Sequence, residues 1–252
     1  MQYRLLTLMF LFLTHYSFAQ DQLDTLRRKD ANGWEFLQIR NFKKVFTEGN
    51  LHNGVREGVW TEYWPTEYPS TMTSYSNGKM EGTKIGVDGI GRVQYIENYK
   101  NEKLEGPRKV FDPERAGRMV ETSYYSDGKK HGNYTKWYGN GQVQETGAYV
   151  YDVRDGVSTW YNESGVKSVE YSYRDGKLDG NASTYYGNGK VSAYGRYTNN
   201  LQTGEWKEYA ENGSLQADGM YKDGEKDGAW KEYDKEGKLV KTVTYKNGVA
   251  KN

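Results

Sequence analysis

The chain has 252 residues, with 35 basic and 34 acidic side chains and a formal net charge of +1. This balance excludes the basic surface typical of a nucleic-acid-binding protein. Hydrophobic residues make up only 35% of the chain, yet 24 Tyr and 7 Trp raise the aromatic share to 15%. A thin sheet built around Tyr and Trp is therefore expected, rather than a thick aliphatic core. The chain has no cysteine, which excludes disulfides, thiol nucleophiles and Cys-ligated metals.

Residues 1–19 have the three parts of a secretory signal peptide. Arg4 supplies the positive charge, residues 5–13 form an apolar stretch, and Ser17 and Ala19 place small residues before a cleavage site at Gln20. A membrane anchor is the alternative, but the apolar run is much shorter than the ~20 residues that span a bilayer. We therefore predict an exported protein, in the periplasm, at the cell surface or outside the cell. Its mature chain is expected to have no transmembrane segment.

A glycine recurs along the chain at an interval of 24 residues, which lengthens to 26 only in the third unit. The series is Gly58, Gly82, Gly106, Gly132, Gly156, Gly180, Gly204 and Gly228. A tyrosine follows seventeen residues after nearly every one of them. A period of about 20–50 residues indicates an array in which each unit buries its apolar face against its neighbours. Residues 54–248 are therefore predicted to form eight repeats.

Residues 20–53 precede the regular repeats. The charged stretch from Asp21 to Asp30 predicts a short helix or a disordered leader. Residues 33–36 resemble a worn repeat start, and residues 45–51 fit the second half of a repeat. We predict an N-terminal cap over residues 32–53, because the terminal units of an array are usually atypical. Residues 249–252 are predicted to be a C-terminal tail.

Each unit has the pattern of a β-hairpin. In the unit that begins at Gly204, two runs of aromatic and β-preferring residues are separated by Asn212-Gly213 and followed by Asp223-Gly224. Gly, Asn and Asp accept the positive φ that tight turns require. The predicted fold is all-β: about eight 24-residue β-hairpins in one elongated, twisted antiparallel meander sheet.

Alternation along the strands predicts which side chains share a face of the sheet. We number each unit from its repeated glycine as position 0. Position 5 is aromatic or apolar, and the tryptophans at position 2 lie on the opposite face of a regular strand: Trp60, Trp206 and Trp230. Position 11, for example Val93, has the parity of the closing tyrosine at position 17 and is expected to share its face. A bulge would change these assignments.

The combined pattern G-x-W-x-x-Y, N-G and Y-x-D-G-K-x-x-G resembles the MORN-repeat variant common in bacterial proteins. The resemblance covers residues 54–248 and is clearest from Gly204 to Tyr245, whereas the second and third repeats have Lys84 and Arg108 in place of Trp. It implies a meander of stacked hairpins that contacts proteins or membranes without catalysis of its own. Some bacterial members are YwqK-like proteins described as antitoxins, and that description fits an exported chain poorly.

Nothing in the residues supports a catalytic, metal-binding or cofactor-binding assignment. The sequence has no nucleophile elbow and no phosphate-binding loop. His52 and His131 are three repeats apart, roughly 30 Å along a stack of strands, so they are not expected to share a metal. The recurring Asp-Gly pairs are explained as turns, because a calcium loop needs carboxylates that converge within one loop. We predict no enzyme activity, no metal and no cofactor.

Four aromatic residues are not required by the repeat pattern and are the candidate partner-binding residues. Trp64, Tyr138 and Tyr186 occupy position 6, and Trp160 occupies position 4. Parity places all four on the face opposite position 5. Ordinary packing of a Tyr-rich sheet is the simpler explanation, while an exposed strip would mark an interaction site.

The predicted function is a non-catalytic exported scaffold or adaptor that binds another protein. A carbohydrate or cell-wall binding module is one alternative, because glycan-binding arrays also present Trp and Tyr, although this chain mostly lacks their runs of adjacent aromatics. Contact with membrane-lipid headgroups is another, which the balanced charge disfavours because anionic lipid attracts basic patches. No contact with nucleic acid is expected.

Overall fold

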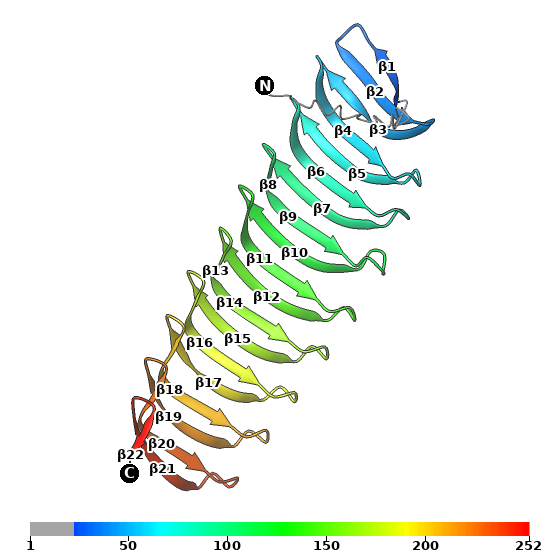
Figure 1. Cartoon of the computed structure of the whole chain (residues 1–252). Helices are drawn as coiled ribbons and strands as arrows, with labels where there is room; N and C mark the ends of the chain where they lie inside the picture. The colour runs from blue at the N-terminus through cyan, green and yellow to red at the C-terminus, as the bar shows by residue number, and fades with distance from the viewer. Residues whose placement is uncertain (1–22, 252) are drawn as a thin grey trace, which may run out of the picture.

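The computed structural model describes residues 23–251, and within them the chain forms one open sheet of 22 strands with no helix. Residues 1–22 and 252, which include the predicted signal peptide, lie outside the described residues. Successive strands pair antiparallel, except where two short segments continue one interrupted strand, so the hairpins follow one another as curved steps from the N-terminal to the C-terminal end (Figure 1). The predicted all-β meander is confirmed.

Three strands precede the regular repeats: β1 (Leu23–Lys29), β2 (Trp34–Asn41) and β3 (Lys44–His52). The helix or disordered leader predicted for residues 21–30 is wrong over the part that the structure describes, since β1 pairs with β2 along its whole length. The physical reason is that β2 would otherwise present a row of unpaired backbone groups at the end of the sheet. Leu26 is the only residue of β1 that is not exposed.

The eight repeats each supply two strand segments, and in the third and fifth repeats the first of them is interrupted by one residue. The strands are β4 (Val55–Tyr63) and β5 (Pro69–Ser76); β6 (Lys79–Val87) and β7 (Val93–Lys100); β8 (Lys103–Leu104), β9 (Gly106–Phe111) and β10 (Met119–Ser126); β11 (Lys129–Trp137) and β12 (Val143–Val150); β13 (Val153–Arg154), β14 (Gly156–Tyr161) and β15 (Lys167–Arg174); β16 (Lys177–Tyr185) and β17 (Val191–Thr198); β18 (Leu201–Tyr209) and β19 (Leu215–Lys222); and β20 (Glu225–Tyr233) and β21 (Leu239–Lys246). The short β22 (Val249–Lys251) covers the end of β21.

Backbone geometry explains the recurring glycine. All eight glycines have positive φ, for example 68° at Gly204, and they lie beside a shift in register between neighbouring repeats. The two-residue turns between repeats also have positive φ at both residues, as in Asp223 (52°) and Gly224 (86°), which suits a tight hairpin turn. Glu102, the irregular residue of this series, adopts the same geometry with φ of 67°.

The core is a row of aromatic side chains on one face of the sheet. Trp60, Trp206 and Trp230 are buried, and the closing Tyr221 packs edge to face between the last two, with its ring centroid 5.7 Å from that of Trp206 and 5.1 Å from that of Trp230. Each indole N–H donates to a backbone carbonyl of the preceding repeat, at 3.0 Å from Trp230 to Met220. Position 2 and position 17 therefore form the core together.

At several repeat boundaries, the side chains that meet complement one another in size or charge. A Cβ atom on Gly195 would stand 2.1 Å from the ring of Trp206, so only glycine leaves room for that ring. In the preceding boundary the order is reversed, and the large Tyr171 lies opposite the small Ala182.

The departure from the repeat pattern at Arg108 is compensated in the same way. Its guanidinium lies 2.9 Å from the carboxylate of Glu97 in the preceding repeat. An ion pair at this boundary thus stands where three other boundaries have a glycine opposite a tryptophan.

A bulge in the second strand of each repeat changes one predicted face assignment. Val93 pairs with Val87, whereas Tyr95 pairs with Gly86, so one extra residue is inserted between the two pairs. The expectation that Val93 shares a face with Tyr99 is therefore wrong, because the inserted residue reverses the alternation. Position 11 is therefore on the same face of the sheet as position 5.

Candidate interaction site at the N-terminal turns

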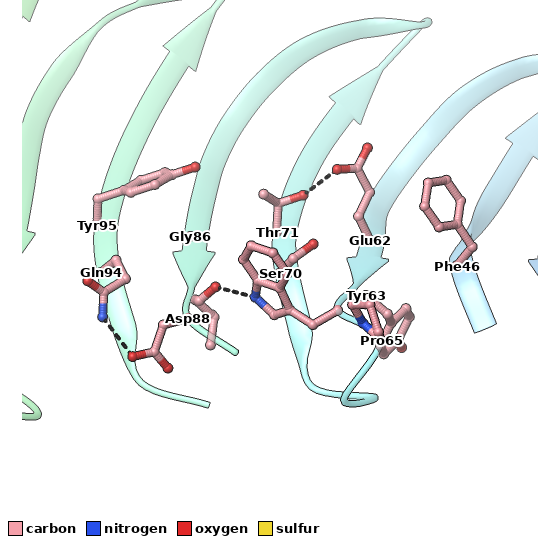
Figure 2. A pocket seen from close by; sticks show the side chains of 12 residues that line it. Phe46, Glu62, Tyr63, Pro65, Ser70, Thr71, Gly86, Asp88, Gln94 and Tyr95 are labelled. Atoms are coloured by element: carbon pink, nitrogen blue, oxygen red, sulfur yellow. Dashed lines mark hydrogen bonds between the residues drawn. The ribbon is translucent and has the colours of Figure 1, made fainter. Parts of the chain in front are cut away.

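A groove of about 630 Å³ crosses the first two regular repeats near their turns (Figure 2). Strands β3 to β7 contribute to it, and its lining includes Phe46, Glu62, Trp64, Val87, Asp88 and Tyr95. A second hollow of about 340 Å³ adjoins it and shares Phe46, Trp64 and the neighbouring Pro65. We call the larger of the two the N-terminal groove.

Backbone contacts fix the shape of this groove. A Cβ atom on Gly86 would lie 2.2 Å from the ring of Tyr95, so the tyrosine lies flat against the backbone of β6. The indole N–H of Trp64 donates to the carbonyl oxygen of Val87 at 2.8 Å and ties the first repeat to the second. The N-terminal groove is therefore already formed in the unbound chain.

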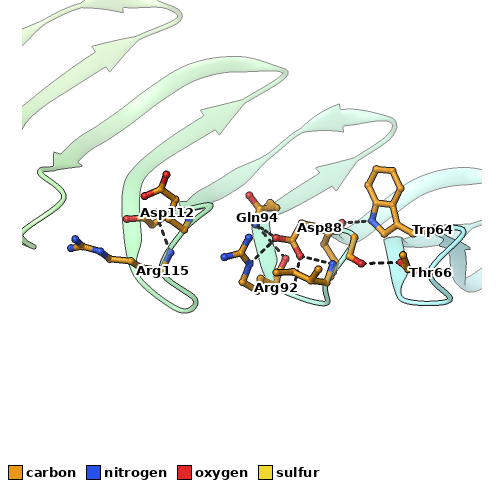
Figure 3. Close-up of polar contacts among 11 residues, drawn as sticks. Trp64, Thr66, Asp88, Arg92, Gln94, Asp112 and Arg115 are labelled. Carbon is orange, nitrogen blue, oxygen red and sulfur yellow. Dashed lines mark hydrogen bonds and ion pairs between the residues drawn. The ribbon is translucent and has the colours of Figure 1, made fainter.

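The charged groups at the groove stabilise structure. Asp88 accepts hydrogen bonds from the backbone N–H groups of Arg92 at 2.9 Å and Ile90 at 3.1 Å, and its other oxygen accepts from the Arg92 side chain at 2.8 Å (Figure 3). The backbone N–H of Arg92 is the main reason that the pKa of Asp88 is lowered. Tyr63 donates to Glu48 at 2.6 Å, and burial followed by this bond raises the pKa of Tyr63 to about 12. Neither group is poised to transfer a proton at neutral pH.

Large apolar side chains are exposed on three successive turns and on the start of β3 near the groove. Phe42 is 72% exposed, Phe46 57% and Ile90 64%, and Trp64 and Tyr68 are exposed as well. We call these five residues the apolar turn patch. Of these five residues, only Trp64 was predicted from the sequence, although the residue type at position 8 also marks this region. Ile90 occupies position 8, where the last five repeats have Asn140, Ser164, Asn188, Asn212 and Glu236.

Three of the four predicted partner-binding residues have the same structural role. The hydroxyl of Tyr138 donates to the carbonyl oxygen of Tyr161 at 2.7 Å, and that of Tyr186 donates to Tyr209 at 2.6 Å. Like Trp64, both side chains therefore bridge to the carbonyl at position 5 of the next repeat. Trp64 also lines the N-terminal groove, three repeats away from Tyr138.

Trp160, the fourth predicted residue, packs within the sheet face. Its ring meets Tyr171 edge to face at 6.1 Å, and the guanidinium of Arg154 lies 5.2 Å from its centroid. Tyr138 donates to the carbonyl of Tyr161, the residue after Trp160, whereas the Trp160 ring contacts Tyr171 and Arg154. The four aromatics are thus distributed along the array, and only Trp64 belongs to the apolar turn patch.

Tyr186→Phe is expected to lower the free energy of unfolding by about 1 kcal/mol, because it removes one hydrogen bond and leaves the Tyr209 carbonyl without that donor. Tyr194→Phe removes a hydroxyl from an exposed tyrosine and is the matched control, with an expected change within about 0.5 kcal/mol. Urea unfolding followed by circular dichroism measures both. Equal losses in the two variants would contradict the bridging role of Tyr186.

Five consecutive stretches of the chain match one family model, whose description is the MORN repeat variant. They are residues 130–151, 154–175, 178–199, 202–223 and 226–247. These five units are similar to MORN repeats. Each matched stretch begins two residues before the repeated glycine. MORN repeats are often involved in protein or membrane-lipid interaction and are generally non-catalytic. A search of curated proteins found no match to this chain.

The three N-terminal repeats lie outside the matched stretches but form the same hairpins, from β4 to β10, with the same positive φ at Gly58, Gly82 and Gly106. The part of the chain that departs most from the MORN pattern is therefore the part that contains the groove and the apolar turn patch. The fold is retained there while the side chains at the turns differ.

Within residues 23–251, no helix is both long enough and apolar enough to cross a membrane. Over the same described part of the chain, no group of three or more His, Asp or Glu side chains is placed to hold a metal ion. His52 stacks on Trp34 and His131 lies against Tyr151, with ring centroids 4.7 Å apart in each pair.

Proposed function

We propose that this chain is an exported, non-catalytic scaffold that binds a partner protein in its N-terminal groove. The observation that carries the proposal is the apolar turn patch: Phe46 and Trp64 line the groove, and Phe42 lines the adjoining hollow. Tyr68 and Ile90 are exposed on the turns that follow β4 and β6. Contiguous exposed apolar surface marks an interaction site, and aromatic side chains are the usual anchors of protein interfaces. The MORN repeats that follow the groove provide an extended support for it.

The export part of the proposal is supported by the charged, apolar and small-residue segments of residues 1–19. A relationship to YwqK-like proteins is part of the same proposal, on the basis of the repeat pattern. An antitoxin role is not included, because an exported chain would be separated from a cytoplasmic toxin.

The test is site-specific photo-crosslinking of the full chain in its source organism. A benzophenone amino acid replaces Phe46 in the groove or, as the control, Val150 at the exposed end of β12 in the middle of the array. We expect a protein adduct from position 46 that is absent from position 150. The adducted protein is then purified, and its affinity is measured for wild-type chain and for two double variants.

The double variant Phe42→Ser/Phe46→Ser is expected to weaken that affinity at least about tenfold, as loss of interface anchors does. Val150→Ser/Val153→Ser removes exposed apolar side chains elsewhere and should leave the affinity unchanged. Equal affinity in the two double variants would contradict the proposal. Binding of lipid vesicles or cell-wall glycan that is lost only in the groove variant would favour one of the alternative functions.

A further inference from the structure

The N-terminal groove and the adjoining hollow form two compartments separated by one ridge. The two compartments share Phe46, Tyr63, Trp64 and Pro65, and these four residues form the ridge. The adjoining hollow extends from β2 to β4, whereas the groove extends from β3 to β7. Their centres therefore lie two strands apart along the array, at β3 and β5. With about 4.8 Å between neighbouring strands, the two centres are about 9.6 Å apart.

This separation matches one conformation of a peptide ligand. A polyproline II segment has three residues per turn and rises about 3.1 Å per residue, so its residues i and i+3 point the same way about 9.3 Å apart. A β-strand presents one side at steps of about 6.6 and about 13 Å, which do not fit. An α-helix presents residues i and i+7 about 10.5 Å apart, but residues i+3 and i+4 lie between them on the same face and would meet the ridge.

The side chains that line the two compartments are of the kind that contacts proline. Phe46 and Trp64 stand on the ridge, and Tyr95 lies at the far end of the groove, flat over Gly86 (Figure 2). Proline-rich segments bind grooves lined by aromatic rings, and their backbone carbonyls make no internal hydrogen bonds. Tyr95 and Ser70 also line the groove with hydroxyl groups, which can donate to such a carbonyl.

Charge in the groove favours a basic residue in the ligand. Three charged residues line the two compartments, and two of them, Asp88 and Lys44, each form an ion pair. The third, Glu62, accepts the hydroxyl of Thr71 at 3.1 Å and forms no ion pair with any residue of the described range 23–251. Glu62 lies on β4, midway between the two centres. Its carboxylate is therefore available to a basic side chain located between the two residues that fill the compartments.

We propose that the N-terminal groove binds a proline-rich segment of the partner protein in the polyproline II conformation. One proline fills the adjoining hollow, and a second proline, three residues away, fills the groove. A basic residue between them pairs with the Glu62 carboxylate. This inference rests on the proposed function, because it specifies the partner of the same site.

The size of the ligand follows from the dimensions of the site. A segment that reaches from β2 to β7 crosses five strand spacings, about 24 Å, and has about eight residues in this conformation. The sequence of this chain contains no such segment, since no two of its four prolines are three residues apart: Pro65, Pro69, Pro107 and Pro113. The ligand therefore belongs to a different protein and not to a second copy of this chain.

The test uses the full chain and three synthetic octapeptides. The first peptide is Ala-Ala-Pro-Ala-Arg-Pro-Ala-Ala, with prolines three residues apart. The second, Ala-Ala-Pro-Arg-Pro-Ala-Ala-Ala, has the same composition with prolines two residues apart. The third is the first peptide with Glu in place of Arg. Affinities are measured from the NMR shifts of the Gly86 amide and the Trp64 indole N–H during titration.

We expect the first peptide to bind about fivefold more tightly than the second, because only one proline of the second peptide can fill a compartment. It should bind about threefold more tightly than the third, as expected for a solvent-exposed ion pair. Glu62→Gln should remove the preference for Arg over Glu and keep the preference for the three-residue spacing. Glu163→Gln, the control, removes an exposed carboxylate from a turn of the fifth repeat and should change neither ratio. Circular dichroism confirms that each variant is folded.

Four outcomes of the titrations would overturn the inference. They are an absence of shifts with the first peptide, equal binding of the first and second peptides, a charge preference that survives Glu62→Gln, and tighter binding of a helical peptide with leucines seven residues apart. Self-association of the wild-type chain in sedimentation equilibrium, abolished by Phe42→Ser/Phe46→Ser, would identify a second copy as the occupant and would also overturn it.

The proposed function is judged separately, by the crosslinked protein. If the titrations fail while a partner crosslinked at position 46 loses affinity in the Phe42→Ser/Phe46→Ser variant, the scaffold function stands and the proline-rich ligand is wrong. Selective binding of the first peptide without any crosslinked partner would support the proline-rich ligand and contradict the scaffold function.

Discussion

Trp206→Ala is expected to lower the free energy of unfolding of the C-terminal repeats by about 3–5 kcal/mol. The indole packs edge to face against Tyr197 and Tyr221, with ring centroids 5.5 and 5.7 Å away, and donates to the carbonyl oxygen of Arg196. Alanine would leave a gap between Gly195 and the two tyrosines. A sheet without a second layer has no other side chains to fill that gap, so most of the loss should remain after relaxation.

Hydrogen exchange of the β17, β18 and β19 amides measures this loss, because the units of a repeat array can unfold locally. Trp34→Ala is the matched control. Trp34 is 41% exposed and stacks on His52 in the cap, so its removal should cost about 1 kcal/mol. Equal losses at the two tryptophans would show that position 2 is not the core of the array.

Gly195→Ala should destabilise the chain by about 1–3 kcal/mol although it adds a single methyl group. The added Cβ would lie 2.1 Å from the ring of Trp206, so the indole or the backbone must move. The φ of Gly195 is not positive, so the cost arises from crowding and not from the backbone conformation.

Gly187→Ala is the control for this substitution. Gly187 also lacks a positive φ, and a Cβ there would meet no atom within 4 Å, so the change should stay within about 0.5 kcal/mol. Urea midpoints compare the two variants. In a Trp206→Phe background the cost of Gly195→Ala should fall, because a smaller ring leaves room for the methyl group. An unchanged cost in that background would contradict steric contact with Trp206.

The hairpin array could be predicted from the sequence because its determinants are local. Positive φ at Gly204 and at Asp223-Gly224 is a requirement of single residues, and it recurs eight times. The face of Val93 could not be predicted, since a bulge of one residue reverses alternation without a distinct sequence signal. The strand β1 was missed for a related reason. Its charged residues suit an edge strand, but they do not by themselves predict a strand. It forms a strand because it pairs with the otherwise unpaired side of β2.

The candidate site was harder to predict than the fold. Phe46 and Trp64 line one groove because strands β3 and β4 are neighbours. The exposure of these two side chains depends on how the nearby turns are placed, which the sequence pattern does not specify. Tyr138 and Tyr186 satisfied the same sequence criterion as Trp64, yet they are half-buried bridges between repeats. Only the three-dimensional structure distinguishes an aromatic side chain that bridges two repeats from one that is exposed.

The complementary pairs at the repeat boundaries also restrict how such a gene can change its length. Loss of residues 204–227 would join Trp230 to Gly195, a junction whose shape already exists elsewhere in the chain. Loss of residues 180–203 would instead press Trp206 against Tyr171. Each whole unit lost would shorten the protein by about 10 Å, the spacing of two strands. A whole-unit deletion is therefore expected to be tolerated better where it brings together a pair that already exists in the chain than where it opposes two large aromatic side chains.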